Sequence, residues 1–592
     1  MSHMAPDLPS FIQQLERAKE LARVRVEVDP IMEITEIATR TVKRGGPGLL
    51  FERVKGSPHQ LAINLLGSAR RIEMALGQHP RQIGESLVRV AERLQPPTLG
   101  GLWDARQTIL RALAMRLSPA AKSPLTLAPD PPSISEFPIL QCWPQDGGRY
   151  ITFGMVLTQD PETGKRNLGV YRMQVLARDR IIVHWQIQKG GGFHYAKAER
   201  MGKPLEIAII IGADPALLIS AIAPLPEDMD ELAFSGFLRG TSLPVVKGRS
   251  TTLPIPANAE IVIEGIVPPR ERAQEGPFGD HFGHYSHPSP FPVVHVQSVW
   301  RRPSPIYLGA VVGKPPQEDR YLGDAVQEML SPLIRLIHPE IKDLWAYYET
   351  GFHNLLVVAV DQRHAKEGVK TALGLFGQAQ LSLTKCIVVV DPSVPVRDFS
   401  AVLNAIRQHF DASKDWLLLP GVPLDTLDFT SFTLNLGSKM ILDATSSADV
   451  PAQEKPLGPI DPVRCDSRIK AWRLLENTLL VVQVPGSDGR NVLERLVREP
   501  SLEPIPLIAA VSPDVPLDDR ELLLCGLFTR FDCARDIMCR EARLRDAWVQ
   551  VKGPLGIDAT FKTGYPDAIV MSPDIVQRVD RRWSEYGIPF PS

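Results

Sequence analysis

A repeat in the last third of the sequence constrains the fold of this chain more than any other feature. Three blocks return in the same order: 390–398 (VDPSVPVRD) as 511–519 (VSPDVPLDD), 410–415 (FDASKD) as 531–536 (FDCARD), and 441–445 (ILDAT) as 556–560 (GIDAT). Ordered matches of this kind indicate a duplicated unit. Buried-strand runs such as 355–360 and 386–390 alternate with helical patterns in the first copy. We therefore expect an α/β unit over 316–458 and a partial second copy over 459–592.

The sequence before the repeat predicts two further domains. Residues 1–125 mix helical periodicity with strand-like pieces, which indicates an α+β domain. Residues 126–315 contain short apolar, β-branched runs separated by Gly and Pro, at 150–153, 181–185, 204–211, 259–267 and 292–296. Such runs are typical of a barrel-like β domain. The sequence thus predicts a multidomain α+β and α/β protein with β structure at its centre.

Composition limits the expected partners and compartment. Lys plus Arg number 66 against 68 Asp plus Glu, a net charge of -2. No basic field favours nucleic acid or an anionic membrane, so small molecules are the expected partners. The 6 cysteines form no C-x-x-C pair, which predicts reduced thiols in a cytoplasmic protein. No signal-peptide pattern is present, and no apolar run approaches the roughly 20 residues of a membrane span.

The hexapeptide 275–280 (EGPFGD) holds two carboxylates, Glu275 and Asp280, on either side of a Gly-Pro/Phe-Gly bend. It follows the strand-like run 259–267, so we expect it at a strand exit, where rigid scaffold meets irregular backbone. Two like charges held close push one pKa upward and leave one acid able to carry a proton near neutral pH. The alternative is a solvated acidic turn. The second copy of the repeat lacks this hexapeptide, so we expect it to serve packing or assembly.

Three other polar segments are candidate binding sites. Arg172 lies in 166–173 (RNLGVYRM), where Gly lets backbone approach a ligand and the guanidinium offers a permanent cation for Glu275 or an anion. The segment 184–192 (HWQIQKGGG) suits phosphate contact through backbone N–H groups, although such glycines also occur in plain loops. Glu231 reads by default as a surface carboxylate on a helix, or as a hard-metal ligand beside Asn167.

His281, His284 and His287 are spaced in threes and allow a zinc hypothesis. Gly283, Pro288 and Pro290 oppose the helix that this spacing would need. A metal-dependent hydrolase using these histidines is therefore an alternative to flavin chemistry.

Taken together and in order, 166–172, 185–191, 212–215 (GADP), 231–241, 275–281 and 437–445 (GSKMILDAT) resemble the UbiD family of reversible decarboxylases over about residues 10–446. The resemblance implies prenylated FMN held in a split β-barrel like that of flavin reductases. It also implies a divalent metal such as Mn²⁺ at the cofactor phosphate, and K⁺ nearby. A homodimer or higher homo-oligomer is the family habit.

The resemblance assigns roles residue by residue. Arg172, Glu275 and Asp280 are the catalytic network, with Asp280 as proton donor, and Asn167 and Glu231 are the metal ligands. The flavin contacts are Val170, Tyr171, Arg172, His184, Trp185, Gln186, Gln188, Lys189, Gly190 and Lys385. Many relatives place a histidine metal ligand where this chain has Gln188, whose amide oxygen can still bind a hard cation.

The implied reaction is reversible non-oxidative decarboxylation of an aromatic, heteroaromatic or α,β-unsaturated carboxylic acid, with CO₂ as the other product. A flavin prenyltransferase is the implied supplier of the cofactor. The long C-terminal part is similar to that of extended decarboxylases associated with menaquinone-type pathways. A non-catalytic flavin-binding or assembly protein remains an alternative, because it would explain both Gln188 and the duplicated tail.

Overall fold

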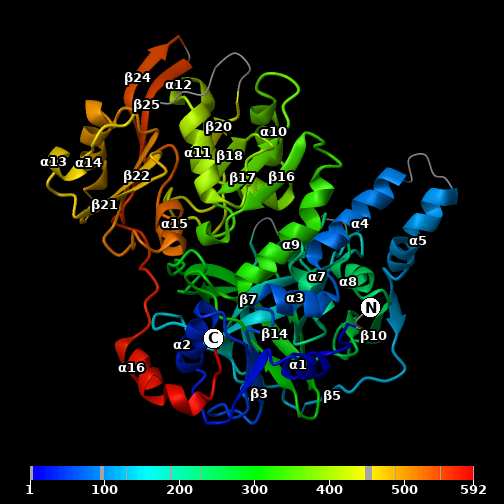
Figure 1. Cartoon of the computed structure of the whole chain (residues 1–592). Helices are drawn as coiled ribbons and strands as arrows, with labels where there is room; N and C mark the ends of the chain where they lie inside the picture. Colours follow the sequence, from blue (N-terminus) through cyan, green and yellow to red (C-terminus); the bar gives the residue numbers. More distant parts are fainter. Residues whose placement is uncertain are drawn as a thin grey trace. The chain divides into compact units, whose positions relative to one another are not determined.

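The computed structural model describes residues 4–93, 99–128, 130–186, 190–226, 229–446, 456–486, 488–546 and 548–590 (Figure 1). The chain forms two compact units. The first unit comprises Met1–Asp280, His284–Pro332 and Ala568–Ser592, and the second comprises His281–Gly283 and Leu333–Asp567. The last residues thus cluster with the first unit rather than with the repeat that precedes them. The division into 1–125, 126–315, 316–458 and 459–592 stays a prediction.

The N-terminal part of the first unit is an α+β structure. Its sheet has the order β1 (Leu21–Val24), β2 (Gly48–Phe51), β3 (Gln60–Ile63) and β15 (Ile306–Leu308). The helices of this part and the helix that follows β15 are α1 (Leu8–Arg17), α2 (Glu33–Lys43), α3 (Ala69–Leu76), α4 (Pro80–Arg93), α5 (Leu99–Leu113) and α9 (Glu318–Ile334). Helix α1 begins where Asp7 Oδ1 accepts the Ser10 N–H at 3.0 Å, a side-chain cap for an otherwise unpaired donor.

A closed barrel forms the centre of the first unit. Six antiparallel strands close it in the order β12 (Ile261–Val267), β9 (Leu205–Ile211), β6 (Tyr150–Gln159), β7 (Arg166–Ala177), β8 (Arg180–Val183) and β14 (Ser289–Arg301), because β14 also pairs with β12. The short strands β5 (Thr126–Leu127) and β13 (Arg272–Glu275) pair with β14. The predicted central barrel is confirmed, and each apolar run used to predict it contains a strand.

Smaller elements surround the barrel. A three-stranded sheet contains β4 (Leu117–Pro119), β10 (Leu243–Lys247) and β11 (Pro254–Pro256). The helices are α6 (Gly190–Arg200), α7 (Pro215–Ile222) and α8 (Glu231–Arg239). Helix α8 begins after Asp230, whose Oδ1 accepts the N–H groups of Leu232 and Ala233. This cap fixes the start of α8 and so the position of Glu231, its first residue.

The second unit contains two five-stranded sheets of the same topology, which confirms the partial repeat. The first has the order β16 (Ile341–Ala346), β17 (Leu356–Val360), β18 (Cys386–Val390), β20 (Leu436–Ala444), β19 (Trp416–Pro423). The second has the order β21 (Ala471–Leu475), β22 (Leu479–Gln483), β23 (Leu507–Val511), β25 (Trp548–Ala559), β24 (Ile537–Arg545). In both sheets the three inner strands are parallel and the edge strands antiparallel.

The remaining helices follow the two copies of the repeat. The first copy has α10 (Glu367–Leu375), α11 (Phe399–His409) and α12 (Ala412–Asp415), and the second has α13 (Pro462–Cys465), α14 (Gly489–Leu496) and α15 (Arg520–Phe528). Short 3-10 helices are Tyr348–Thr350, Ala379–Leu383, Pro500–Leu502 and Trp583–Tyr586. Helix α16 (Pro573–Arg582) follows the second sheet and packs on α2.

Equivalent faces of the two sheets share one core. Val357 and Val388 of the first copy are buried in the same apolar cluster as Val481 and Ala509, which hold the matching strand positions in the second. Burial of the same face from both copies resembles a two-fold interface within one chain. The matching faces explain why the repeat preserves its apolar pattern.

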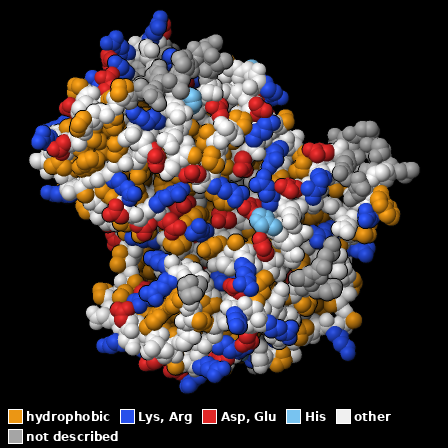
Figure 2. Space-filling view, viewed as in Figure 1, with side chains coloured by type: hydrophobic (Ala, Val, Ile, Leu, Met, Phe, Trp, Pro, Cys, Tyr) orange, Lys and Arg blue, Asp and Glu red, His pale blue; other side chains and the backbone are white. Residues whose placement is uncertain are grey.

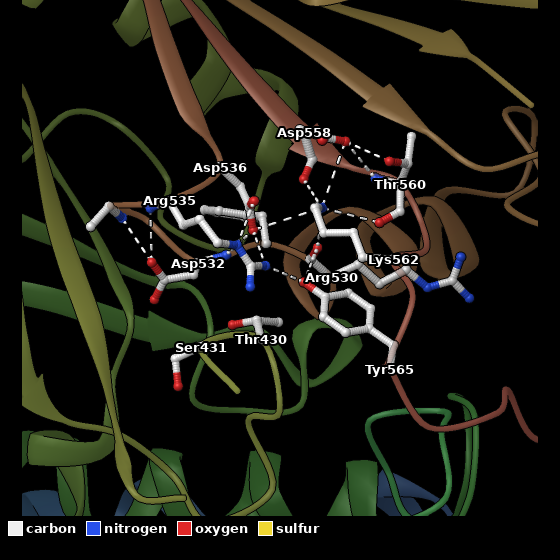
Figure 3. Close-up of polar contacts among 12 residues, drawn as sticks. Thr430, Ser431, Arg530, Asp532, Arg535, Asp536, Asp558, Thr560, Lys562 and Tyr565 are labelled. Atoms are coloured by element: carbon white, nitrogen blue, oxygen red, sulfur yellow. Dashed lines mark hydrogen bonds and ion pairs between the residues drawn. The ribbon is translucent and has the colours of Figure 1, made fainter. Parts of the chain in front are cut away.

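The two copies also keep an aspartate pair at the end of the sheet. In the first copy, Lys366 Nζ lies 2.5 Å from Asp415 Oδ1 and 2.9 Å from Asp443 Oδ2. In the second copy, the matching Asp536 and Asp558 face Lys562, which comes from a different place in the chain (Figure 3). The repeat has therefore kept the carboxylates while the cation that faces them changed position.

The surface carries no field of one sign on the face seen in Figure 2, where Lys and Arg are interspersed with Asp and Glu. Among the described residues, no helix combines the length and the apolar character needed to cross a membrane.

Candidate functional site

Arg172 joins the two carboxylates of the hexapeptide. It lies on β7, and Glu275 is the last residue of β13, a short strand that sequence patterns did not reveal. Arg172 Nε donates to Glu275 Oε1 at 3.0 Å and Nη2 donates to Oε2 at 3.1 Å. Its Nη1 forms a short ion pair with Asp280 Oδ2, and Nη2 also donates to Ser286 Oγ at 3.0 Å. The structure thus brings together the three residues of the predicted catalytic network.

The charges of this cluster are fixed by burial and by Arg172. Burial alone would raise the pKa of Glu275, but the Arg172 charge and hydrogen bonds from His184 and Arg172 lower that pKa to about 2. Glu275, which is 0% exposed, is therefore a carboxylate at neutral pH, so it is not the acid with the raised pKa that the sequence led us to expect. Burial lowers the pKa of Arg172, but the two carboxylates more than offset this and leave it raised.

His184 extends the cluster toward the predicted cofactor site. Its Nδ1 lies 3.1 Å from Glu275 Oε2, and its ring lies 4.0 Å from that of Phe291. Burial and the nearby Arg172 charge lower the pKa of His184, so its ring is neutral at pH 7. With the carboxylate accepting at Nδ1, the proton lies on that nitrogen and Nε2 is the acceptor.

Two buried ring nitrogens in this region, His184 Nε2 and Trp185 Nε1, lack a hydrogen-bond partner among the described residues. Buried polar atoms are almost always paired, so these two ring nitrogens could each pair with a polar group of a bound ligand. Gly191 packs here too, since a Cβ on it would lie 2.6 Å from Trp185 Nε1. An acceptor facing the indole and a donor facing the imidazole fit a flavin-type ligand. Val170 and Gln186 flank this region half-buried, whereas Gln188 and Lys189 lie outside the described residues.

Asn167 and Glu231, the predicted metal ligands, are in direct contact. Asn167 Nδ2 donates to Glu231 Oε1 at 3.0 Å, and the Leu168 N–H donates to Oε2 at 2.9 Å. Asn167 Oδ1 accepts from the Tyr171 hydroxyl at 3.3 Å, and a Cβ on Gly190 would lie 2.7 Å from Asn167 Cγ. Burial raises the pKa of Glu231 to about 7. The default expectation of a surface carboxylate is wrong, because α8 buries this side chain against β7.

These donors suit a hard cation. A buried carboxylate and a neighbouring amide, whose oxygen here accepts from Tyr171, are groups that can supply the oxygen ligands Mn²⁺ or Mg²⁺ prefer. Among the described residues, no group of three or more His, Cys, Asp or Glu side chains is placed to hold a metal. The same finding removes the zinc hypothesis, because His281, His284 and His287 do not form such a group.

Asp146 holds the hexapeptide loop in place and was missed by sequence reasoning. Its Oδ1 accepts the Gly279 N–H at 2.8 Å, and Oδ2 accepts the N–H groups of Cys142 and Trp143. A Cβ on Gly279 would lie 2.2 Å from Trp143 Cδ1, so this position requires Gly. The residue next to Asp280 is thus held by both a hydrogen bond and a packed ring. In the sequence, an Asp before Gly147 only indicates a turn.

Lys385, the last predicted flavin contact, lies in the second unit. Its ammonium is fully buried and pairs with Asp428 Oδ2 at 2.9 Å, and it donates to the Phe531 carbonyl at 2.9 Å. These contacts link the two copies of the repeat. A role at the flavin stays a prediction.

Three family models match the chain. They describe the N-terminal, Rift-related and C-terminal domains of 3-octaprenyl-4-hydroxybenzoate carboxy-lyase and match residues 12–91, 117–315 and 320–444. A protein of Archaeoglobus fulgidus is 40% identical over 479 residues, which are 80% of this chain and 99% of that protein. A component of the 4-hydroxybenzoate decarboxylase of Chlamydia pneumoniae is 35% identical over 574 residues, covering 96% of each chain.

Solved structures agree. The closed form of the vanillic acid decarboxylase ShVdcCD of Sedimentibacter hydroxybenzoicus has a TM-score of 0.67 at 26% identity, covering 78% of this chain and 97% of that one. The UbiD-class enzyme HmfF of Pelotomaculum thermopropionicum in complex with FMN has a TM-score of 0.63 at 28% identity, covering 77% and 98%. A structure of an evolved dimeric HmfF contains prFMN. With the barrel and the Arg172 cluster, these matches show that the chain belongs to the UbiD family of carboxy-lyases.

Proposed function

We propose that this protein carries out reversible, non-oxidative decarboxylation of an aromatic, heteroaromatic or α,β-unsaturated carboxylic acid with prenylated FMN, and that Asp280 is its proton donor. The observation that carries the proposal is one cluster. Arg172 pairs with Glu275 and Asp280, and beside it lie His184 Nε2 and Trp185 Nε1, which have no hydrogen-bond partner in the described part of the chain. Similarity to HmfF, whose structures contain FMN or prFMN, supports the choice of cofactor.

The residues have distinct tasks in this proposal. His184, Trp185 and the Gly190–Gly191 backbone hold the flavin, and Asn167 and Glu231 hold Mn²⁺ or a similar cation at its phosphate. The bound cofactor supplies the electron sink for carbon–carbon cleavage. Arg172, a permanent cation, orients Asp280, and Glu275 remains anionic and neutralises Arg172. Asp280 delivers the proton to the carbon that loses CO₂, and takes it back in the reverse direction.

The finer assignments belong to the same proposal. K⁺ accompanies the divalent cation, a flavin prenyltransferase supplies the cofactor, and the protein works in the cytoplasm as a homodimer or higher homo-oligomer. The buried carboxylate of Glu231 supports the cation, because a metal ion offsets the cost of burying its charge.

The first experiment is to co-produce the chain with a flavin prenyltransferase, purify it without oxygen, and record its ultraviolet-visible and mass spectra. Near-stoichiometric modified flavin is expected. Loaded protein is then tested for CO₂ release from a panel of aromatic and unsaturated acids. Asp280→Asn is expected to keep the flavin and to lose at least about 100-fold in turnover, the scale of general-acid catalysis.

A matched carboxylate-to-amide control is Glu494→Gln, an exposed residue of α14. It is expected to keep both flavin and turnover. Full turnover in Asp280→Asn would overturn the proton-donor role. Bound flavin without CO₂ release from any acid would favour a flavin-binding or assembly protein instead.

A further inference from the structure

The end of the chain returns to the first unit after the second sheet is complete. We call residues 568–590 the C-terminal strap. Five of its apolar side chains enter the main core of the first unit: Ile569, Met571, Ile575, Val579 and Tyr586. The last of the three family matches ends at residue 444, so this segment is not part of the matched domains. Its burial shows that it is a packed element of the first unit and not a loose tail.

Charged and aromatic contacts fasten the strap to α2, which lies beside α16 in Figure 1. Arg582 Nη1 lies 2.5 Å from Glu33 Oε1, which also accepts the Tyr586 hydroxyl at 2.9 Å. Arg40 Nη1 lies 2.5 Å from Asp580 Oδ1, and its guanidinium carbon lies 5.6 Å from the centre of the Trp583 ring. Because Glu33 is only 2% exposed, removing its cation leaves a buried charge under-compensated.

The other end of the strap pairs with the catalytic loop. Ala568 forms an antiparallel bridge with His284. The His284 carbonyl accepts the Asp280 N–H at 3.0 Å, and Gly279 bridges Tyr285 on the same ribbon. Through His284, the backbone of Asp280 is therefore linked to the strap by one hydrogen bond and one isolated β-bridge.

We propose that the C-terminal strap is a positioning element for Asp280, with Arg582 and Trp583 as its anchoring residues. By pairing with His284 and fastening to α2, the strap holds the Asp280 backbone at a fixed distance from Arg172. Displacement of a catalytic group by about 1 Å can cost 100-fold in rate. This inference rests on the proposed function for its effect on catalysis, but its structural part is measurable without activity.

The test is hydrogen–deuterium exchange of the full-length chain followed by mass spectrometry. In the double variant Arg582→Met/Trp583→Ala, we expect the peptide covering 278–288 to exchange about tenfold faster, while peptides from β18 and β23 keep their rates. The matched control Arg581→Met removes an exposed cation one residue away on α16 and is expected to change nothing. The single variant Arg582→Lys keeps the charge, so the peptide covering 278–288 is expected to exchange at close to the parent rate.

In cofactor-loaded protein, the double variant is expected to lose about tenfold in kcat, with KM and flavin content unchanged. Faster exchange in α16 with unchanged exchange in 278–288 would overturn the positioning role. If no decarboxylase activity exists, the exchange result alone still decides the structural part, so the two failures are distinguishable. Should the double variant unfold globally, the single variant Arg582→Met provides the same comparison.

Discussion

Arg172 and Glu275 form a bidentate pair, with Nε–Oε1 at 3.0 Å and Nη2–Oε2 at 3.1 Å, around a carboxylate that is 0% exposed. This geometry leaves Nη1 of Arg172 for Asp280. His184 Nδ1 contacts Oε2 of Glu275, the oxygen that also accepts from Arg172 Nη2. One guanidinium thus positions two acids that lie close together in sequence, and it keeps the pKa of Glu275 low.

Glu275→Gln removes the charge that Arg172 and His184 share. We expect the unfolding free energy to fall by up to about 5 kcal/mol, because the buried Arg172 then keeps only one of its two carboxylate partners. The lowered pKa of Glu275, about 2 against the ordinary 4.5, means that its stabilisation is complete above pH 4.5 and is lost as pH falls toward 2. Denaturant unfolding at pH 7 and pH 3 measures both effects. A variant as stable as the parent at pH 7 would contradict the buried pair.

Gly279→Ala places a Cβ against the Trp143 ring, 2.2 Å from Cδ1. Either the ring or the loop must shift, at a cost of about 1–3 kcal/mol. We expect the CO₂-release rate to fall clearly while the melting temperature changes little, because the displaced loop residue is next to Asp280. Gly458→Ala is the control, since nothing lies within 4 Å of a Cβ at that position. Equal activity of the two variants would show that the loop tolerates the displacement.

Asp146 gives the loop a dependence on pH. Burial raises its pKa to about 6 from 3.8. The folded chain therefore takes up a proton between pH 6 and pH 3.8, and the contribution of this group to stability falls as pH rises through that window. Protonation of Asp146 also weakens one of its two oxygens as an acceptor for the N–H groups of Gly279, Cys142 and Trp143. Exchange of the Gly279 amide, corrected for intrinsic rates, should accelerate below pH 6, and this step should be absent in Asp146→Asn.

Glu231→Gln removes the only charged member of the predicted metal pair. We expect metal content, measured by inductively coupled plasma mass spectrometry, to fall at least about tenfold after dialysis, and flavin retention to fall with it. In the parent, Asn167 and the Leu168 N–H donate to different oxygens of Glu231. Gln has only one oxygen to accept them. Unchanged metal content in this variant would place the cation elsewhere.

Lys385→Met leaves Asp428 buried without its cation. We expect a loss of about 3–5 kcal/mol in unfolding free energy, because a buried pair is costly to break on one side. The double variant Lys385→Met/Asp428→Asn is expected to recover part of that loss. Flavin content per folded chain, measured in the same samples, tests the predicted flavin contact. A drop in flavin content in both variants would support that contact.

The sequence by itself determined the local structure and the identity of the candidate groups. Apolar runs such as 205–211 became barrel strands, because nearly every side chain of such a run is buried on one face or the other. The repeat specified two sheets of one topology, and the motif order indicated the family. The bend in the hexapeptide paired Glu275 with Asp280, and the resemblance to the UbiD family added Arg172 to that pair.

Tertiary structure decided the contacts between residues far apart in sequence. Asp146 reaches Gly279, and Ala568 reaches His284, over separations at which local patterns carry no information. The ionisation of Glu275 was likewise decided by folding. A pair of nearby acids alone predicts a raised pKa. Arg172 on β7, which the sheet order β7-β8-β14-β13 brings to β13, instead lowers the pKa of Glu275. Burial and long-range pairing are properties of the folded chain, and they set the chemistry of this site.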